Sequence, residues 1–161
     1  MNNKNEKRMN WVFAALFVSG LGFLSLNSCE KSGCHEKNIS AAGGSKSHNK
    51  GQNCMNCHYS GGEGEGCFTA AGTAYDASLT TTLNGGTIQF FTEPDGGGTL
   101  IKSVAIDTKG NFYTTESFDV QGLYPALKTS SGNMYYMGSA LSNGQCNSCH
   151  NNSTTDRISG N

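Results

Sequence analysis

The stretch Thr99-Leu-Ile-Lys-Ser-Val-Ala-Ile-Asp-Thr-Lys-Gly-Asn-Phe-Tyr-Thr-Thr115 decides the fold, because it places two β-rich segments around a turn. Val, Ile, Phe, Tyr and Thr favour strands, and Lys-Gly-Asn is a turn signal. Strands are therefore expected at 99–107 and 111–115. The same pattern extends outward, with turn signals at 84–86, 94–98 and 131–133. It predicts four further strands, at 69–75, 87–92, 123–128 and 133–137.

Six short strands separated by turns predict an all-β fold, a small Ig-like antiparallel β-sandwich over residues 69–138. No convincing amphipathic helix interrupts them. Residues 29–50 are polar and rich in Gly, Ser, Asn and Lys, which predicts a flexible tether. Six alternating strands would bring residues 68 and 138 to the same end of the sandwich. The segments before and after it, 51–68 and 139–161, are therefore expected to be neighbours.

Each of these flanking segments contains one Cys-x-x-Cys-His pentapeptide. The copies are Cys54-Met-Asn-Cys57-His58 and Cys146-Asn-Ser-Cys149-His150. This is the c-type haem attachment signature, in which two thiols bond to the haem vinyl groups and the following histidine ligates the iron. We therefore predict two haem-binding loops and two covalently bound haem c groups. The expected cofactor-binding residues are Cys54, Cys57, His58, Cys146, Cys149 and His150.

Two other interpretations of the cysteine pairs remain open. Four cysteines in two Cys-x-x-Cys pairs also suit a tetrathiolate zinc site that joins the two ends of the domain. A zinc site does not need a histidine after both pairs, and thiolate zinc is commoner in reducing compartments. A thioredoxin-like redox pair is less favoured, because Gly51-Gln52-Asn53 does not resemble the strand that precedes such a motif.

His58 and His150 supply one iron ligand each, so a second ligand has to come from elsewhere in the chain. His48 is the favoured distal candidate, and Met137 is the competing one. His35 is a weaker candidate, since it lies beside Cys34 near the tether. Ordinary core packing is the simpler role for Met137.

The N-terminal residues predict export. Lys4, Lys7 and Arg8 precede an apolar run at 11–26, which is short for a membrane span and typical of a signal peptide. Leu26-Asn27-Ser28-Cys29 resembles a bacterial lipoprotein lipobox. This resemblance implies that residues 1–28 are removed, that Cys29 is lipidated, and that the protein is exported. It would be a periplasmic, outer-membrane or cell-surface lipoprotein.

Cys34 and Cys67 remain once the other cysteines are assigned, and we expect them to form a disulfide in an oxidising compartment. After residue 28 the chain has eight Lys and Arg against eleven Asp and Glu, a net charge of about −3. It has no basic stripe with interleaved aromatic residues, which argues against nucleic acid as a partner.

The sandwich resembles the carboxypeptidase regulatory-like, or transthyretin-like, family over roughly residues 70–138. The resemblance is carried by Ala71-Gly72-Thr73-Ala74-Tyr75-Asp76, by Gly86-Thr87-Ile88-Gln89-Phe90 and by the run from Ala105 to Tyr113. It implies the sandwich fold, and it brings no catalytic residue.

Together these features predict a dihaem c-type cytochrome lipoprotein for extracytoplasmic electron transfer, an electron carrier rather than a catalyst. Its partners would be other redox proteins, as donor and acceptor, and the membrane through the lipid. One alternative is a haem-free sandwich lipoprotein, a binding module stabilised by zinc or disulfides. Another is a dihaem peroxidase or reductase with an open iron position.

Overall fold

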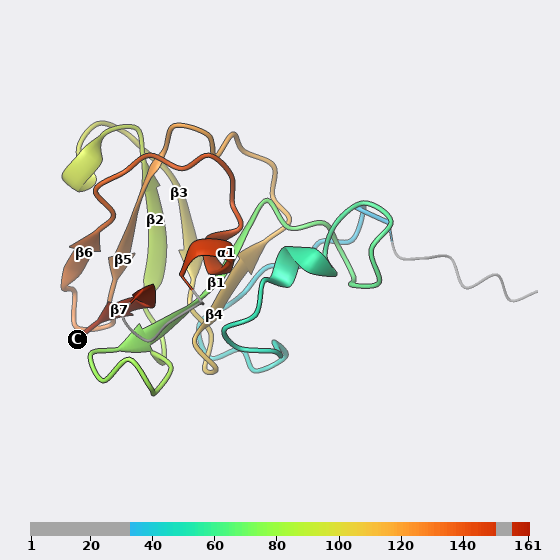
Figure 1. The fold of residues 1–161 in the computed structure, drawn as a ribbon, viewed down its shortest axis with the longest axis horizontal. Coiled ribbons are helices and arrows are strands. Elements are labelled where there is room, and N and C mark those ends of the chain that lie inside the picture. Colours follow the sequence, from blue (N-terminus) through green and yellow to red (C-terminus); the bar gives the residue numbers. More distant parts are fainter. Residues whose placement is uncertain (1–32, 151–155) are drawn as a thin grey trace, which may run out of the picture.

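The computed structural model describes residues 33–150 and 156–161, and its core is a two-layer β-sandwich (Figure 1). All six predicted strands are confirmed to within two residues at each end. They are β1 (Ala70–Asp76), β2 (Thr87–Phe91), β3 (Leu100–Ala105), β4 (Asn111–Thr114), β5 (Tyr124–Lys128) and β6 (Met134–Tyr136). A seventh strand, β7 (Ile158–Gly160), was not predicted. Single helical turns occur at η1 (Cys54–Asn56) and α1 (Cys146–Cys149), and η2 (Pro94–Gly96) is a kinked turn with Asp95 at φ 56°.

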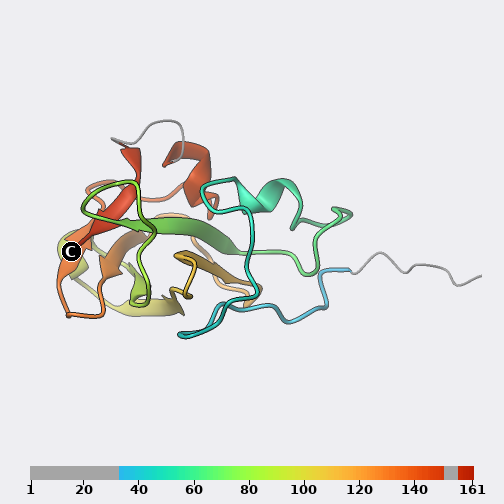
Figure 2. The same ribbon diagram turned by 90° about the horizontal axis from the view of Figure 1, so that it is seen from below.

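The strands form two sheets, with the orders β4-β1-β7 and β3-β2-β5-β6. Figure 2 shows the two layers seen along the sandwich. The turn at 106–110 carries the chain from β3 in one sheet to β4 in the other. Every named strand pair is antiparallel except β1 and β7, in which Ala74 lies opposite Ile158 in parallel register. The all-β sandwich prediction is confirmed.

The core lies between the sheets and follows the two-residue period of the strands. In β2, Ile88 and Phe90 are buried while Thr87, Gln89 and Phe91 are only partly covered. The buried cluster also includes Val104, Ile106, Phe112, Leu123 and Leu127. Burying each of these large side chains contributes about 1.5–3 kcal/mol.

Strand β1 is buried over six of its seven residues, and it is built from small side chains. Its one glycine, Gly72, is where Phe112 and Cys146 approach the strand backbone most closely. A Cβ atom there would lie 2.5 Å from Cζ of Phe112 and 2.9 Å from Cβ of Cys146. Core side chains and the segment that carries α1 therefore both pack against β1.

The described part of the expected tether runs along the outer edge of β4. The amide of Ser40 donates to the Tyr113 carbonyl at 2.9 Å, and Ile39 forms an antiparallel bridge with Thr114. Residues 1–32, which contain the expected signal peptide and Cys29, lie outside the described residues. Within the described residues, no helix is long and apolar enough to cross a membrane.

Candidate functional site

The first Cys-x-x-Cys-His segment forms a tight helical turn. The side chain of Asn53 caps it by accepting from the Met55 amide at 3.2 Å. The amides of Cys57 and His58 both donate to the Cys54 carbonyl, at 3.2 and 3.0 Å. This winding gathers the two thiols and the imidazole within one turn of chain.

The His58 ring is buried, with 7% of its surface exposed, and it is held on two sides. It stacks on Phe68 with ring centroids 4.0 Å apart and an interplanar angle of 10°. Its Nδ1 lies 2.9 Å from the carbonyl oxygen of Glu65. A carbonyl oxygen can only accept, so Nδ1 carries the proton and Nε2 of the neutral ring keeps its lone pair. The local contacts thus leave Nε2 as the available ligand atom.

A cavity of about 690 Å³ opens beside this segment, and we call it the Cys54 cavity. His48 is exposed at its wall, with its ring centroid 5.9 Å from that of His58. The structure therefore brings together His58 and the favoured distal candidate. The wall also includes Cys54, Cys57, Phe68, Tyr113 and the charged residues Glu36, Lys37, Lys46, Glu63 and Glu65.

The second Cys-x-x-Cys-His segment repeats this arrangement. It forms α1, and the amide of His150 donates to the Cys146 carbonyl at 3.0 Å. Nδ1 of His150 lies 2.5 Å from the carbonyl oxygen of Asp156. By the same reasoning Nε2 is left as the available ligand atom. The two histidines therefore share one hydrogen-bonding pattern.

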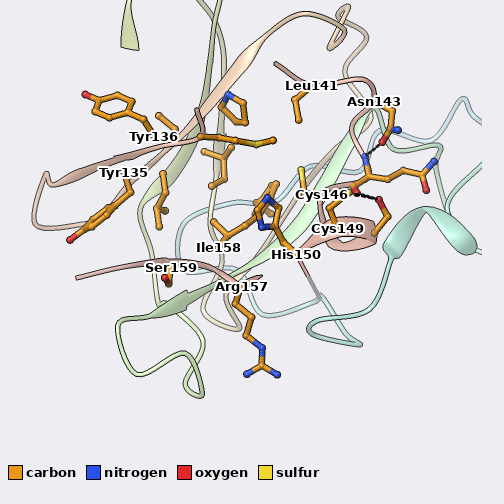
Figure 3. A pocket seen from close by; sticks show the side chains of 18 of the residues that line it. Tyr135, Tyr136, Leu141, Asn143, Cys146, Cys149, His150, Arg157, Ile158 and Ser159 are labelled. Atoms are coloured by element: carbon orange, nitrogen blue, oxygen red, sulfur yellow. Dashed lines mark hydrogen bonds between the residues drawn. The ribbon is translucent and has the colours of Figure 1, made fainter. Parts of the chain in front are cut away.

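A second cavity, of about 300 Å³, lies beside this segment, and we call it the Cys146 cavity. Figure 3 shows Cys146, Cys149 and His150 on one side of it and Tyr135 and Tyr136 on the other. Its wall is richer in apolar side chains than that of the Cys54 cavity. It includes Met137, the competing distal candidate, together with Ile88, Phe112, Leu127, Leu141 and Ile158.

The two segments contact each other. The side-chain amide of Asn53 donates to Oε1 of Gln145 at 2.8 Å, and that of Asn147 donates to the Gln52 carbonyl at 2.8 Å. In Figures 1 and 2, α1 and the turn at Cys54–Asn56 lie on the same side of β1.

Thr73 of β1 anchors both segments. Its hydroxyl accepts from the Gly51 amide at 2.8 Å, and its amide donates to Oδ1 of Asn147 at 3.0 Å. The hydroxyl also donates to Oδ1 of Asn111 at 2.7 Å. Because these groups are buried and hydrogen-bonded, the network fixes the two segments relative to the sheet.

Burial controls the chemistry of two of the four thiols. It raises the pKa of Cys54 above the ordinary value, and the neighbouring Cys57 adds a smaller effect in the same direction. Burial also raises the pKa of Cys146 to about 12. Both groups are therefore protonated at neutral pH, which disfavours the thiolate that a thioredoxin-like exchange reaction needs.

The cofactor prediction has to be corrected. The described residues, 33–150 and 156–161, contain no group of three or more His, Cys, Asp or Glu side chains placed to hold a metal ion. This finding overturns the prediction of two covalently bound, iron-containing haem c groups, and the four thiols do not converge into a zinc site either. A metal centre needs several deprotonated donors at one point. In the described residues no third His, Cys, Asp or Glu side chain completes such a group at either segment.

The predicted Cys34–Cys67 disulfide is present, with Cα atoms 4.6 Å apart. His35 beside it is exposed and does not line either of the two cavities described above. Cys29, the expected lipidation site, lies outside the described residues.

Several residues of the site were not predicted from the sequence. Glu65 acts through its main-chain carbonyl, Phe68 through ring stacking, and Asn147 through a buried network. The glycine-rich run at 61–66 was the one sequence feature that could have indicated a close approach of the main chain to His58. A Cβ atom at Gly64 would lie 2.6 Å from the His58 ring, so this position requires glycine for close approach.

No protein-family model matches this chain, and comparisons with curated proteins and with solved structures find no match.

Proposed function

We propose that this protein is an exported electron-transfer protein of the c-type cytochrome class. One observation carries the proposal: two Cys-x-x-Cys-His segments lie side by side, each beside a cavity, and each histidine holds Nδ1 on a backbone carbonyl. This hydrogen bond orients a histidine for ligation through Nε2. Neither a count of two haem groups nor a set of iron ligands belongs to the proposal, because the described residues form no ligand group for a metal ion.

The contact between the segments supports transfer of electrons rather than a single-site reaction. Asn53 and Gln145, which immediately precede the two segments, are hydrogen-bonded at 2.8 Å. A redox group held at one segment would therefore lie next to the other segment. One-electron exchange at iron is the chemistry that haem supplies in this class of protein, and the protein contributes attachment and orientation.

We propose that the chain is exported and held at a membrane by lipid on Cys29. The basic N-terminus, the apolar run at 11–26 and the lipobox-like Leu26-Asn27-Ser28-Cys29 support this location. Its partners would be other redox proteins at the same membrane, as donor and acceptor. The net charge of about −3 after residue 28, with no basic stripe, argues against binding nucleic acid.

A haem-free binding module is the second candidate, and the Cys146 cavity favours it. This cavity is walled largely by apolar and aromatic side chains, with a few polar groups such as His150 and Arg157. Such a composition is typical of sites for small, mostly apolar ligands. The disulfide at Cys34–Cys67 would then stabilise an exported capture protein.

The test is the colour and mass of the full chain, expressed with its signal in a bacterium that attaches haem to exported proteins. An electron-transfer protein should show sharp visible bands in the reduced state, and its intact mass should exceed that of the lipidated polypeptide. Cys57→Ser or Cys149→Ser should remove this added mass, according to which segment carries the attached group. Gly138→Ala serves as the control, because it adds a Cβ atom where nothing lies within 4 Å.

A colourless protein with the mass of the lipidated polypeptide alone would contradict the electron-transfer proposal. The binding-module candidate would then be tested by the thermal shift that small apolar compounds produce. Addition of carbon monoxide or cyanide to a coloured protein separates an electron carrier from a peroxidase or reductase. Only an open iron position changes its spectrum on binding these ligands.

A further inference from the structure

The His58 ring is enclosed by the segment that follows it. Residues 61–68, which we call the return segment, fold back over the ring. Glu65 contributes its carbonyl to Nδ1 at 2.9 Å, and Phe68 stacks on the ring face. Gly64 packs so closely that a Cβ atom there would lie 2.6–2.7 Å from three ring atoms. Three of the eight residues in this return segment thus contact one imidazole.

Main-chain hydrogen bonds hold the return segment in place. The Gly64 amide donates to the Cys57 carbonyl at 3.0 Å, and the Phe68 amide donates to the His58 carbonyl at 3.0 Å. The segment otherwise has little that would order it, since its composition is dominated by Gly and Glu. Glycine-rich chain loses more conformational entropy on ordering than other chain does, so an additional restraint is needed.

The stretch at 34–38, which lies outside the return segment, supplies that restraint. Cys34 is bonded to Cys67, and the side-chain amide of Asn38 donates to the Glu65 carbonyl at 3.2 Å, the same oxygen that faces His58. A Cβ atom at Gly66 would lie 2.9 Å from the Glu36 carbonyl, so the two stretches are in close contact. The disulfide thus lies between the two residues, Glu65 and Phe68, that hold the ring.

We propose that the Cys34–Cys67 disulfide is a positioning clamp for His58. By fixing Glu65 and Phe68, it sets the orientation of the ring and keeps the proton on Nδ1, with Nε2 available for ligation. The inference rests on the proposed function only in that His58 is the ring which that function uses. His150 provides a contrast, since Cys34–Cys67 is the disulfide among the described residues and it lies beside the segment that holds His58. Among the described residues, the two segments are therefore unequal, because an oxidised cysteine pair lies beside His58 and none lies beside His150.

The experiment compares the full lipidated protein with its Cys34→Ser/Cys67→Ser variant at one fixed pH. Deuterium exchange at the carbon between the two ring nitrogens reports the environment of each histidine, and amide exchange reports Gly64 and Phe68. We expect exchange at His58 and at these two amides to accelerate by roughly tenfold or more in the variant, as protection is lost. Exchange at His150 should stay unchanged, and exposed His35 gives the unprotected reference.

A second pair of variants leaves the disulfide in place. Gly64→Ala inserts a Cβ atom against the ring, whereas Gly138→Ala adds one where nothing lies within 4 Å. Gly64→Ala should accelerate exchange at His58, and Gly138→Ala should not. If the serine variant does not fold, the wild-type protein is compared before and after reduction of the Cys34–Cys67 disulfide, and unchanged exchange at His58 overturns the clamp.

Unchanged exchange at His58 in a folded Cys34→Ser/Cys67→Ser variant also overturns the proposal, as does equal acceleration at His58 and His150. The readout follows a protein ring and two amides, so it applies to a coloured or a colourless protein. Failure of the clamp is therefore distinguishable from failure of the electron-transfer proposal.

Discussion

Asn53 donates its side-chain amide to Oε1 of Gln145 across 2.8 Å, although 92 positions separate the two residues in the sequence. Each of them immediately precedes one Cys-x-x-Cys-His segment. The contact therefore joins the starting points of the two segments, and Asn147 reinforces it from inside the second segment. The predictions below follow from this paired arrangement and from the sheet beneath it.

Replacing Asn147 should destabilise the protein substantially. Its side chain is 3% exposed and satisfies the buried Thr73 amide as well as the Gln52 carbonyl. Asn147→Ala leaves these groups without partners, which should cost about 2–4 kcal/mol in the free energy of unfolding. Urea unfolding followed by circular dichroism measures this loss. Asn84→Ala, in an exposed turn, should change the free energy by less than about 0.5 kcal/mol. Equal stability of the two variants would contradict the buried network.

Adding a single methyl group to β1 should disturb both the core and the second segment. Gly72→Ala places Cβ 2.5 Å from Cζ of Phe112 and 2.9 Å from Cβ of Cys146. Overpacking of this kind costs about 1–3 kcal/mol. The melting temperature should fall for Gly72→Ala. It should not change for Gly138→Ala, because nothing lies within 4 Å of a Cβ atom at that position. A melting temperature that Gly72→Ala leaves untouched would show that α1 does not pack against this strand.

Removing the Cys34–Cys67 disulfide should lower the free energy of unfolding by about 3–4 kcal/mol, because the bridge closes a loop between residues 33 positions apart. The Cys34→Ser/Cys67→Ser variant tests this in urea. The control is Ser45→Ala/Ser60→Ala, which alters two exposed side chains of the same region. A loss no larger than that of the control would mean that the bridge does not restrain the unfolded chain.

In protein that carries free thiols, Cys146 should make stability depend on alkaline pH. Burial raises its pKa in the folded state to about 12, from an ordinary value of 9.0. A raised pKa means that the folded state retains the proton longer than the unfolded state. The contribution is therefore complete below about pH 9 and declines as pH rises toward 12.

This alkaline decline can be isolated by comparing urea midpoints from neutral pH to about pH 10.5 for the wild type and Cys146→Ser. The serine variant should show a shallower fall. Wild-type protein in which the Cys146 sulfur is bonded to another group should behave like the serine variant, since a thioether does not titrate. Parallel pH profiles for free-thiol wild type and Cys146→Ser would refute the effect.

Replacing Cys29 should release the protein from the membrane. Cys29→Ala removes the sulfur that lipid attachment requires, so the protein should move from the membrane fraction to the soluble or unprocessed fraction. Ser32→Ala, which leaves the lipobox-like stretch intact, should remain with the membrane. Fractionation and intact mass give the readout. Retention of Cys29→Ala at its mature mass in the membrane would refute the lipid anchor.

Most of the sandwich could be predicted because each strand carries a local signal. Alternating apolar residues such as Ile88 and Phe90, bounded by turn residues, locate a strand without knowledge of its partners. Strand β7 lacks such a signal. It has three residues, Ile158–Gly160, and it exists through parallel pairing with β1, more than 80 positions away in the sequence. Contacts of that range leave no local pattern.

The residues of the site also divide into those with a local sequence signal and those that only the folded structure brings together. The two Cys-x-x-Cys-His segments were found from residue type and spacing, and the Cys34–Cys67 bridge was predicted as the pair of cysteines left over in an oxidising compartment. The groups that orient His58 were not, since a main-chain carbonyl such as that of Glu65 belongs to every residue and is selected only by the folded geometry. Asn147 likewise looks like an ordinary polar residue until β1 is placed beneath it. The prediction of two haem c groups went beyond what the motif alone could support.

Because Thr73 of β1 anchors the start of both segments, they have a common mechanical support. Fluctuations that detach this strand would release both segments together, so neither segment should unfold while the other stays folded. On heating, both sites should be lost in a single concerted step, and neither should survive as an isolated fragment.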